Sequence, residues 1–351
     1  MAYTTIDDPT IYFNTVLFTG NGSTQSITGV GFQPDWVWIK NRGATTNHEV
    51  ADVVRGVNKL LKTNDVDAEQ DNSNKITSFD SDGFGVGNDA NVNQSSTAIV
   101  SWNWKAGGSA SSNSNGTITS TVSANQTAGF SIVSYTSNGS ASQTVGHGLG
   151  AVPQMIISKN RDSSSSSYNY WTVYHHSLAT ANDKKLKLNT TDAASTTNEW
   201  GDTDPTSTVY SIHTSGDGTT NHSSDKIIAY CFTGKKGYSS FGSYTGNGNA
   251  DGTFIYTGFR PAMIIIKRTS ASDRWVISDN KRDPDNPVIG ELNPNGSASE
   301  DTSSTPFDFL SNGFKIRRTG NVFNGSGSTY IYMAFAESPF VNSSGIPCNA
   351  R

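Results

Sequence analysis

Two kinds of residue in this sequence have the types and spacing that chemistry requires: closely spaced carboxylates and histidines. Asp80 and Asp82 lie two residues apart in FDSDGF (79–84), followed by a glycine, as in a calcium-binding loop. Such a loop needs further oxygen ligands and a bidentate glutamate, which the next residues do not provide. The related segment FLSNGF (309–314) keeps the glycine and both phenylalanines but has no aspartate. We therefore interpret residues 79–84 as a structural turn and predict no metal site.

Carboxylate pairs could also serve glycoside hydrolysis, in which two acidic groups flank the scissile bond. Asp202 and Asp204, and likewise Asp283 and Asp285, have a spacing that suits one face of a strand. Both pairs lie next to prolines in polar surroundings, which is typical of solvated turns. The six histidines have no metal-binding or catalytic spacing, and the sequence contains no P-loop, Rossmann glycine pattern or G-x-S-x-G motif. The sequence therefore predicts a protein that is not an enzyme and has no cofactor.

Tryptophans are the remaining candidates for a binding site. Trp36 and Trp38 alternate along one predicted strand, as do Trp102 and Trp104 along another, and such pairs on one strand face are typical of a core. Trp200 differs because it lies in the polar stretch TTNEWGDTDP, where an exposed indole could stack on a sugar or dock on a partner. Trp200 is the one candidate binding residue, with a small local core as the alternative.

The composition argues against several classes of function. The 351 residues carry a net charge of −5, and Lys and Arg form no cluster of the kind that binds nucleic acid. The longest apolar runs, such as IYMAFA (331–336), are far shorter than the roughly 20 residues that a membrane-spanning helix needs. Two cysteines are too few for a disulfide framework, and the start MAYTTIDDPT has no signal-peptide pattern. We expect no nucleic-acid partner, no membrane insertion and no secretion signal.

One phrase occurs three times, as QPDWVWIKNR (33–42), VPQMIISKNR (152–161) and RPAMIIIKRT (260–269). Each copy has a lysine six residues after its proline, namely Lys40, Lys159 and Lys267. Each phrase follows a hairpin-like segment, which in all three copies contains Asn-Gly, and each copy closes on an apolar, aromatic-containing strand. The sequence therefore predicts an all-β protein of three tandem β-sandwich-like domains, built from a repeated unit of about 100 residues.

The predicted boundaries follow from this repeat. Residues 1–108 form an N-terminal segment and the first β-domain, residues 128–237 the second, and residues 238–351 the third with a C-terminal tail. Residues 109–127 are expected to be a Gly/Ser-rich linker with a possible strand. In the second copy His147 takes the place of a valine in the first, which argues against a catalytic role for it.

Residues 49–63 allow two interpretations. The apolar residues of EVADVVRGVNKLLKT have helical spacing, which favours a helix. The corresponding stretch of the third copy contains two prolines, and that of the second copy has a strand–loop–strand pattern. A hairpin that breaks near Arg55 and Gly56 is therefore the preferred interpretation, with the helix as the alternative.

Several phrases resemble a known group of proteins: MAYTTIDDPTIYF, GFQPDWVWIKNR, DVVRG, FDSDGFGVG, WNWKAGG and YIYMAFAESPFV. They are similar to structural proteins of tailed-bacteriophage virions, in particular tail-fibre-like proteins of phages that infect marine bacteria and cyanobacteria. The likeness covers nearly the whole chain, including both ends. It supplies framework residues of β-domains and no active-site residues.

The resemblance implies a non-enzymatic virion structural protein that is assembled in the host cytoplasm. The expected role is a tail or tail-fibre component, a homo-oligomer that contacts neighbouring virion proteins and a host surface glycan or receptor. One alternative is a capsid decoration or head-fibre protein of the same build. Another is a glycan-binding (lectin-like) or depolymerising protein, for which Trp200 is the one candidate residue in the sequence.

Overall fold

The computed structural model describes residues 2–162, 169–214 and 219–348. All pairings between the strands named below are antiparallel, and the chain is an all-β protein of several separate sheets, which confirms the predicted fold class. Among the described residues, no helix is long and apolar enough to cross a membrane.

Module 1 (residues 13–104) contains two sheets and follows a short 3-10 helix, η1 (Pro9–Ile11). Its elements are β1 (Phe13–Thr19), β2 (Gln25–Thr28), β3 (Trp36–Asn41), β4 (Glu49–Asp52), β5 (Lys59–Lys62), β6 (Gln70–Asp71), β7 (Ile76–Asp80), β8 (Gly83–Val86), α1 (Ala90–Asn93) and β9 (Ala98–Trp104). The large sheet has the order β1-β9-β3-β4-β5-β6, and the small sheet has the order β2-β8-β7.

Module 2 (residues 111–232) repeats this plan with additional strands. Its elements are β10 (Ser111–Asn113), β11 (Ser120–Asn125), β12 (Phe130–Thr136), β13 (Gln143–Gly146), β14 (Met155–Asn160), β15 (Trp171–His175), η2 (Ala181–Asp183), β16 (Lys184–Lys187), β17 (Ser195–Thr196), β18 (Val209–Ile212) and β19 (Lys226–Phe232). The large sheet has the order β10-β11-β12-β19-β14-β15-β16-β17, and β13 pairs with β18.

Module 3 (residues 239–339) has two sheets of four and three strands. Its elements are β20 (Ser239–Thr245), β21 (Phe254–Tyr256), β22 (Phe259–Arg268), β23 (Trp275–Asp279), β24 (Phe307–Leu310), β25 (Gly313–Ile316), α2 (Asn321–Asn324) and β26 (Thr329–Pro339). The orders are β20-β26-β22-β23 and β21-β25-β24. The same four-strand order therefore recurs in the large sheets as β1-β9-β3-β4, β12-β19-β14-β15 and β20-β26-β22-β23.

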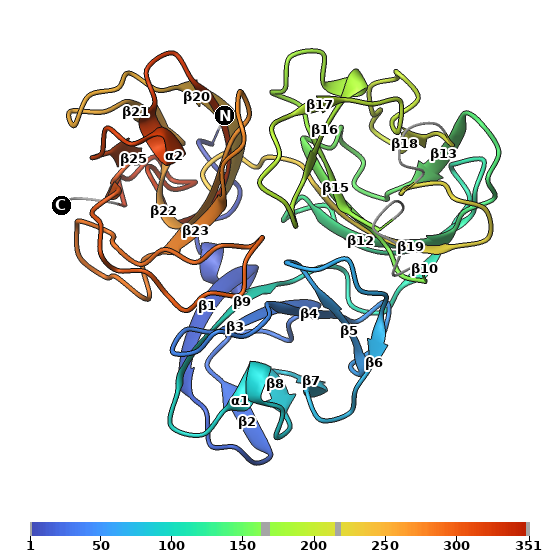
Figure 1. Ribbon diagram of the computed structural model, residues 1–351, viewed down its shortest axis with the longest axis horizontal. Helices are drawn as coiled ribbons and strands as arrows, with labels where there is room; N and C mark the ends of the chain where they lie inside the picture. Colours follow the sequence, from blue (N-terminus) through green and yellow to red (C-terminus); the bar gives the residue numbers. More distant parts are fainter. Residues whose placement is uncertain (1, 163–168, 215–218, 349–351) are drawn as a thin grey trace.

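The three modules surround a shared centre (Figure 1). One continuous cluster of buried apolar side chains includes residues of all three modules. In this cluster Trp36 stacks on Tyr230 of module 2, with ring centroids 4.3 Å apart, and Phe13 stacks on Phe335 of module 3 at 4.9 Å. The three modules are packed into a ring around one core, because the aromatic faces of their large sheets bury one another.

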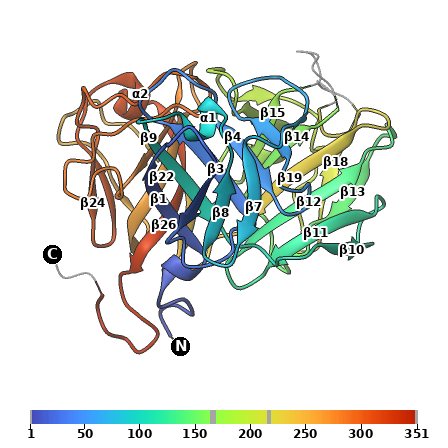
Figure 2. The same ribbon diagram turned by 90° about the horizontal axis from the view of Figure 1, so that it is seen from below.

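Two local predictions bear on this packing. Residues 49–63 form a hairpin of β4 and β5, as the preferred interpretation stated, and Gly56 adopts the positive φ that its turn requires. The segment 109–127 contains β10 and β11, which extend the large sheet of module 2 beyond β12 (Figure 2). The linker stretch therefore covers a sheet edge.

Candidate functional site

The predicted binding residue Trp200 lies inside the protein. Its exposed fraction is 2%, and its indole Nε1 donates a hydrogen bond to the carbonyl of Lys184 at 3.0 Å. The indole packs edge-on against Tyr174, with ring centroids 5.7 Å apart. Trp200 is therefore part of a local core, which corrects the expectation of an exposed anchor that stacks on a sugar.

In two of the acidic pairs singled out in the sequence, one carboxylate binds backbone N–H groups. Asp82 lies in the turn between β7 and β8, and its carboxylate accepts hydrogen bonds from the backbone N–H groups of Gly29 (3.1 Å) and Gly31 (2.7 Å). Asp283 accepts from the N–H groups of Ile289 and Gly290 in the same way. Within the described ranges, no three His, Cys, Asp or Glu side chains are grouped so that they could hold a metal ion.

The three lysines of the repeated phrase connect the modules. Each is fully buried, and each ammonium donates hydrogen bonds to a carbonyl of another module. The acceptors are Val66 for Lys159 (3.3 Å), Ser297 for Lys40 (3.1 Å) and Thr191 for Lys267 (3.1 Å). Module 2 thus reaches module 1, module 1 reaches module 3, and module 3 reaches module 2, so the ring closes on itself.

Burial makes these lysines unusually weak bases. Desolvation lowers the pKa of Lys159 to about 7, and it lowers the pKa of Lys40 and of Lys267 to about 8. A lysine in such surroundings can be a catalytic base. Here the Nζ atom of each lysine donates hydrogen bonds to main-chain carbonyls at a junction between modules.

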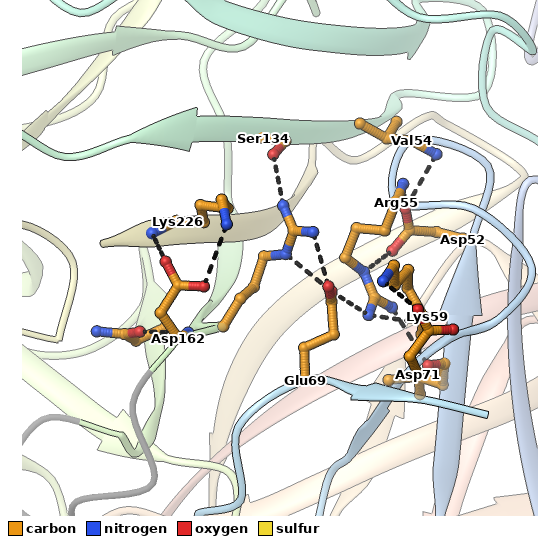
Figure 3. Close-up of polar contacts among 12 residues, drawn as sticks. Asp52, Val54, Arg55, Lys59, Glu69, Asp71, Ser134, Asp162 and Lys226 are labelled. Carbon is orange, nitrogen blue, oxygen red and sulfur yellow. Dashed lines mark hydrogen bonds and ion pairs between the residues drawn. The ribbon is translucent and has the colours of Figure 1, made fainter. Parts of the chain in front are cut away.

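The junction between modules 1 and 2 contains a buried chain of charged groups (Figure 3). The Arg55 guanidinium binds Asp52 at 2.6 Å and Glu69 at 3.2 Å, and Glu69 binds Arg161 of module 2 at 2.8 Å. The hydroxyl of Tyr230 donates to Asp52 at 2.7 Å. Burial alone would raise the pKa of Glu69, but the two guanidinium groups lower it, so the pairing favours the ionised form.

The junction between modules 3 and 1 has the same construction. Arg282 binds Asp279 at 2.6 Å and Glu300 at 2.7 Å, and Glu300 binds Arg42 of module 1 at 2.7 Å. Trp102 takes the place of Tyr230, because its indole Nε1 donates to Asp279 at 3.0 Å. Two junctions of the ring are therefore closed by equivalent aspartate–arginine–glutamate–arginine chains.

The third junction, between modules 2 and 3, has the same backbone and different side chains. Strand pairing makes His175 the equivalent of Asp52 and Asp279, and Leu178 follows it at the position of the arginine. The N–H of Ala194 donates to the carbonyl of Thr269 at 3.0 Å, as that of Glu69 does to the carbonyl of Arg161 at 2.8 Å. Ala194 and Thr269 thus occupy the glutamate and second arginine positions, so this junction has no ionic chain at these positions.

A cleft of about 400 Å³ lies at this third junction. Leu178, Ala194 and Thr269, which replace the ionic chain, all line it. Ser243 lines it too, at the position where Ser134 receives a hydrogen bond from Arg161 in the first junction. The cleft is thus the space that larger charged side chains fill elsewhere in the ring.

A second distinctive surface is the edge strand β21. Its outward side chains Phe254 and Tyr256 have exposed fractions of 43% and 57%. Strand pairing gives Ser26 and Thr28 as their equivalents in module 1. Module 3 therefore exposes aromatic rings where module 1 exposes small hydroxyl side chains.

The antiparallel strands of the three modules, packed around a shared aromatic core, make this chain an all-β protein of several sheets. A family model described as a domain of unknown function (DUF7483) matches residues 8–339. The chain therefore belongs to this family, and the match extends over all three modules. No curated protein and no solved structure matches the chain.

Reasoning from the sequence missed the charged junctions. The signal was present as DVVR at 52–55 and DNKR at 279–282, which have the same Asp-x-x-Arg spacing, whereas the second copy has HHSL at 175–178. A comparison of the three copies at these positions would have separated the two ionic junctions from the open one.

Proposed function

We propose that this chain is a non-enzymatic structural protein of a tailed-phage virion. In this proposal it is a tail or tail-fibre component that contacts neighbouring virion proteins and the host surface. The resemblance of its framework phrases to such proteins supports the role. The use of its buried lysines and arginines to hold the ring together supports a rigid scaffold, because these groups are already committed to the junctions.

The observation that carries the contact with other virion proteins is the exposed aromatic pair on β21. Within the described part of the chain, β21 pairs with β25 along one edge, and no strand covers its other edge. An uncovered edge offers backbone donors and acceptors to another chain, and exposed aromatic residues are frequent anchors of protein interfaces. The combination at Phe254 and Tyr256 suits a docking surface for a neighbouring protein.

Two alternative roles would use surfaces of the same structure. A capsid decoration or head-fibre protein would use the same edge of β21 against the capsid lattice. A glycan-binding protein would use the cleft between modules 2 and 3, which is lined by hydroxyl groups and apolar side chains. Trp200 no longer supports this alternative, because its indole is buried.

The proposal is tested by immunogold electron microscopy of particles produced by the genome that encodes the chain, with antibodies raised against the purified protein. Gold on the tail or its fibres is the expected result. Gold on the capsid would replace the tail assignment by the decoration role. Particles without gold, when antibodies against a known virion protein label them, would contradict a virion role altogether.

A further inference from the structure

We propose that the cleft between modules 2 and 3 binds a sugar that carries a carboxylate, of the hexuronic acid type. This inference goes beyond the structural role because it assigns a ligand class to a particular site. It rests on the side chains of the third junction and holds whether or not the chain is part of a virion.

The cleft has room for a small ligand. At the other two junctions the equivalent volume is occupied by arginine and glutamate side chains that bind one another at 2.7–3.2 Å. Leu178, Ala194 and Thr269 are shorter, and the junction keeps the same backbone hydrogen bond, so the modules do not close over the gap. A volume of about 400 Å³ lies within the usual range for small-molecule sites.

The charge of the lining favours an anionic ligand. Of the described residues that line the cleft, Lys184 is the one cation and none is acidic. The Lys184 ammonium donates to the hydroxyl of Thr196 at 2.6 Å and lies 3.7 Å from the carboxylate of Asp183, which is outside the lining. An ammonium has three protons, so it can donate to a ligand as well. A ligand with one negative charge and no positive charge fits this lining.

The lining of the cleft combines hydroxyl and apolar groups. Hydroxyl side chains line the cleft at Ser177, Ser243, Thr245, Thr269 and Thr329. They both donate and accept, as a polyhydroxylated ligand requires. The apolar part of the lining includes Leu178, Ala179, Ala194 and Ile331, whereas the rings of Tyr244 and Tyr330 stack on each other in the core of module 3. Such a surface suits the C–H face of a sugar ring.

The backbone of β20 adds polar groups. β20 is an edge strand, and the carbonyl of Phe241 points away from its sheet, because it lies 2.9 Å from Nε2 of His176 in module 2. Peptide groups alternate in direction along a strand, so the N–H and carbonyl of Ser243 face the same edge, toward the cleft. A ligand there can bind the main chain of module 3 and the Lys184 side chain of module 2 together.

The test is titration of the intact chain with D-galacturonate, with D-galactose as the uncharged comparison, followed by isothermal calorimetry and by NMR saturation transfer. The expected result is binding of galacturonate at least tenfold tighter than galactose. Lys184→Met should remove this difference in affinity between the two sugars. An oligogalacturonate that binds more tightly than the monomer would identify a polysaccharide as the source, and equal binding would identify a free sugar.

Two further variants locate the site. Ala194→Glu with Thr269→Arg restores the glutamate–arginine half of the ionic chain, which fills the cleft with larger side chains and should abolish binding of both sugars. If that variant does not fold, Thr245→Trp places a large side chain at the exposed rim instead, with Thr136→Trp as the matched change at the equivalent exposed position of module 2. Absence of galacturonate binding to the unmodified chain would overturn the proposal, as would equal affinity for galactose or unchanged binding in the rim variant.

Discussion

The indole Nε1 of Trp102 donates a hydrogen bond to Oδ2 of Asp279 at 3.0 Å, across 177 residues of sequence and from the first module to the last. The hydroxyl of Tyr230 makes the equivalent contact with Asp52 at 2.7 Å between modules 2 and 1. Each aspartate also holds the arginine three residues further on. Each aspartate carboxylate therefore binds an arginine of its own module and a side chain of the neighbouring module. This couples folding of the module to closure of the ring.

Removal of the arginine from one junction should be costly. Arg55→Leu leaves the carboxylates of Asp52 and Glu69 in a buried site without the cation between them. We expect a loss of about 3–5 kcal/mol in the free energy of unfolding, the usual range when one partner of a buried ion pair is deleted. Urea denaturation followed by tryptophan fluorescence measures it.

Conversion of the whole junction should be milder. The variant Asp52→His, Glu69→Ala and Arg161→Thr, added to Arg55→Leu, gives this junction the residue types of the third one. Because no buried charge is then left alone, we expect more than half of the lost free energy of unfolding to return. A fourfold variant that is less stable than Arg55→Leu would contradict this expectation. It would show that the ion pairs themselves stabilise the ring, and that the loss in Arg55→Leu is not caused mainly by unpaired buried carboxylates.

The buried lysines should make the free energy of unfolding increase with pH in the alkaline range. The pKa of Lys159 is lowered to about 7 from 10.5 by burial, so between these pH values the unfolded chain binds a proton that the folded chain does not. The free energy of unfolding therefore rises with pH in this window. Above about pH 10 the buried tyrosines, such as Tyr230, whose pKa burial raises, reverse the trend as tyrosines of the unfolded chain ionise.

The variant Lys159→Met isolates one of these groups. Between pH 8 and pH 9.5 we expect its slope of unfolding free energy against pH to be lower by about 1.4 kcal/mol per pH unit, the value for one proton. Lys281→Met, at an exposed position, serves as the matched control and should keep the slope of the unmodified protein. Identical slopes in both variants would contradict the role assigned to Lys159.

His147 should contribute to instability in acid. Its ring Nδ1 accepts from the N–H of Leu149 and its Nε2 lies 3.2 Å from the carbonyl of Thr206, a pattern that suits the neutral ring. Burial lowers the pKa of His147 to about 4 from 6.5, so its contribution to the free energy of unfolding is lost as the pH falls from 6.5 to 4.

His147→Val, which places in module 2 the residue type of Val30 in module 1, should flatten the acid limb of the stability curve by up to about 1.4 kcal/mol per pH unit. Chemical denaturation at pH 4.5, 5.25 and 6 measures this slope. An unchanged slope would mean that other groups determine the acid response.

Much of the fold follows from periodicity and repetition. The repeated lysine phrase identified the central strands β3, β14 and β22, and the alternation of Trp36, Trp38, Trp102 and Trp104 identified core positions, all of which are buried. The shared core could not be predicted from the sequence. Alternation of apolar residues predicts that one face of a strand is buried, but it does not show which module packs against that face.

The site was harder to predict because its key residues act through contacts between modules. Trp200 has polar neighbours in sequence, yet Tyr174 and the carbonyl of Lys184 enclose its indole. The cleft arises because Leu178 and Ala194 are smaller than the arginine and glutamate at the equivalent positions of the other junctions. Small residues of this kind form no sequence motif that could be recognised. Only the comparison of equivalent positions makes such a gap visible.

The edge of β21 should control association of the protein. We expect the purified chain to be a homo-oligomer at micromolar concentration by light scattering, and the variant Phe254→Ser with Tyr256→Thr to dissociate toward the monomer. The substituted residues are those at the equivalent positions of module 1, and Ser26→Ala with Thr28→Ala is the matched control. An oligomer of unchanged mass in the β21 variant would place the contact elsewhere, and a monomeric unmodified chain would contradict the expected homo-oligomer.

The central claim is that the three modules fold as one closed ring, on which both the scaffold role and the cleft between modules 2 and 3 depend. Differential scanning calorimetry of the intact chain tests it most directly. The shared core and the three junctions predict a single transition, with equal calorimetric and van't Hoff enthalpies. Two or three separate transitions, with a van't Hoff enthalpy well below the calorimetric one, would show independent domains and contradict the account.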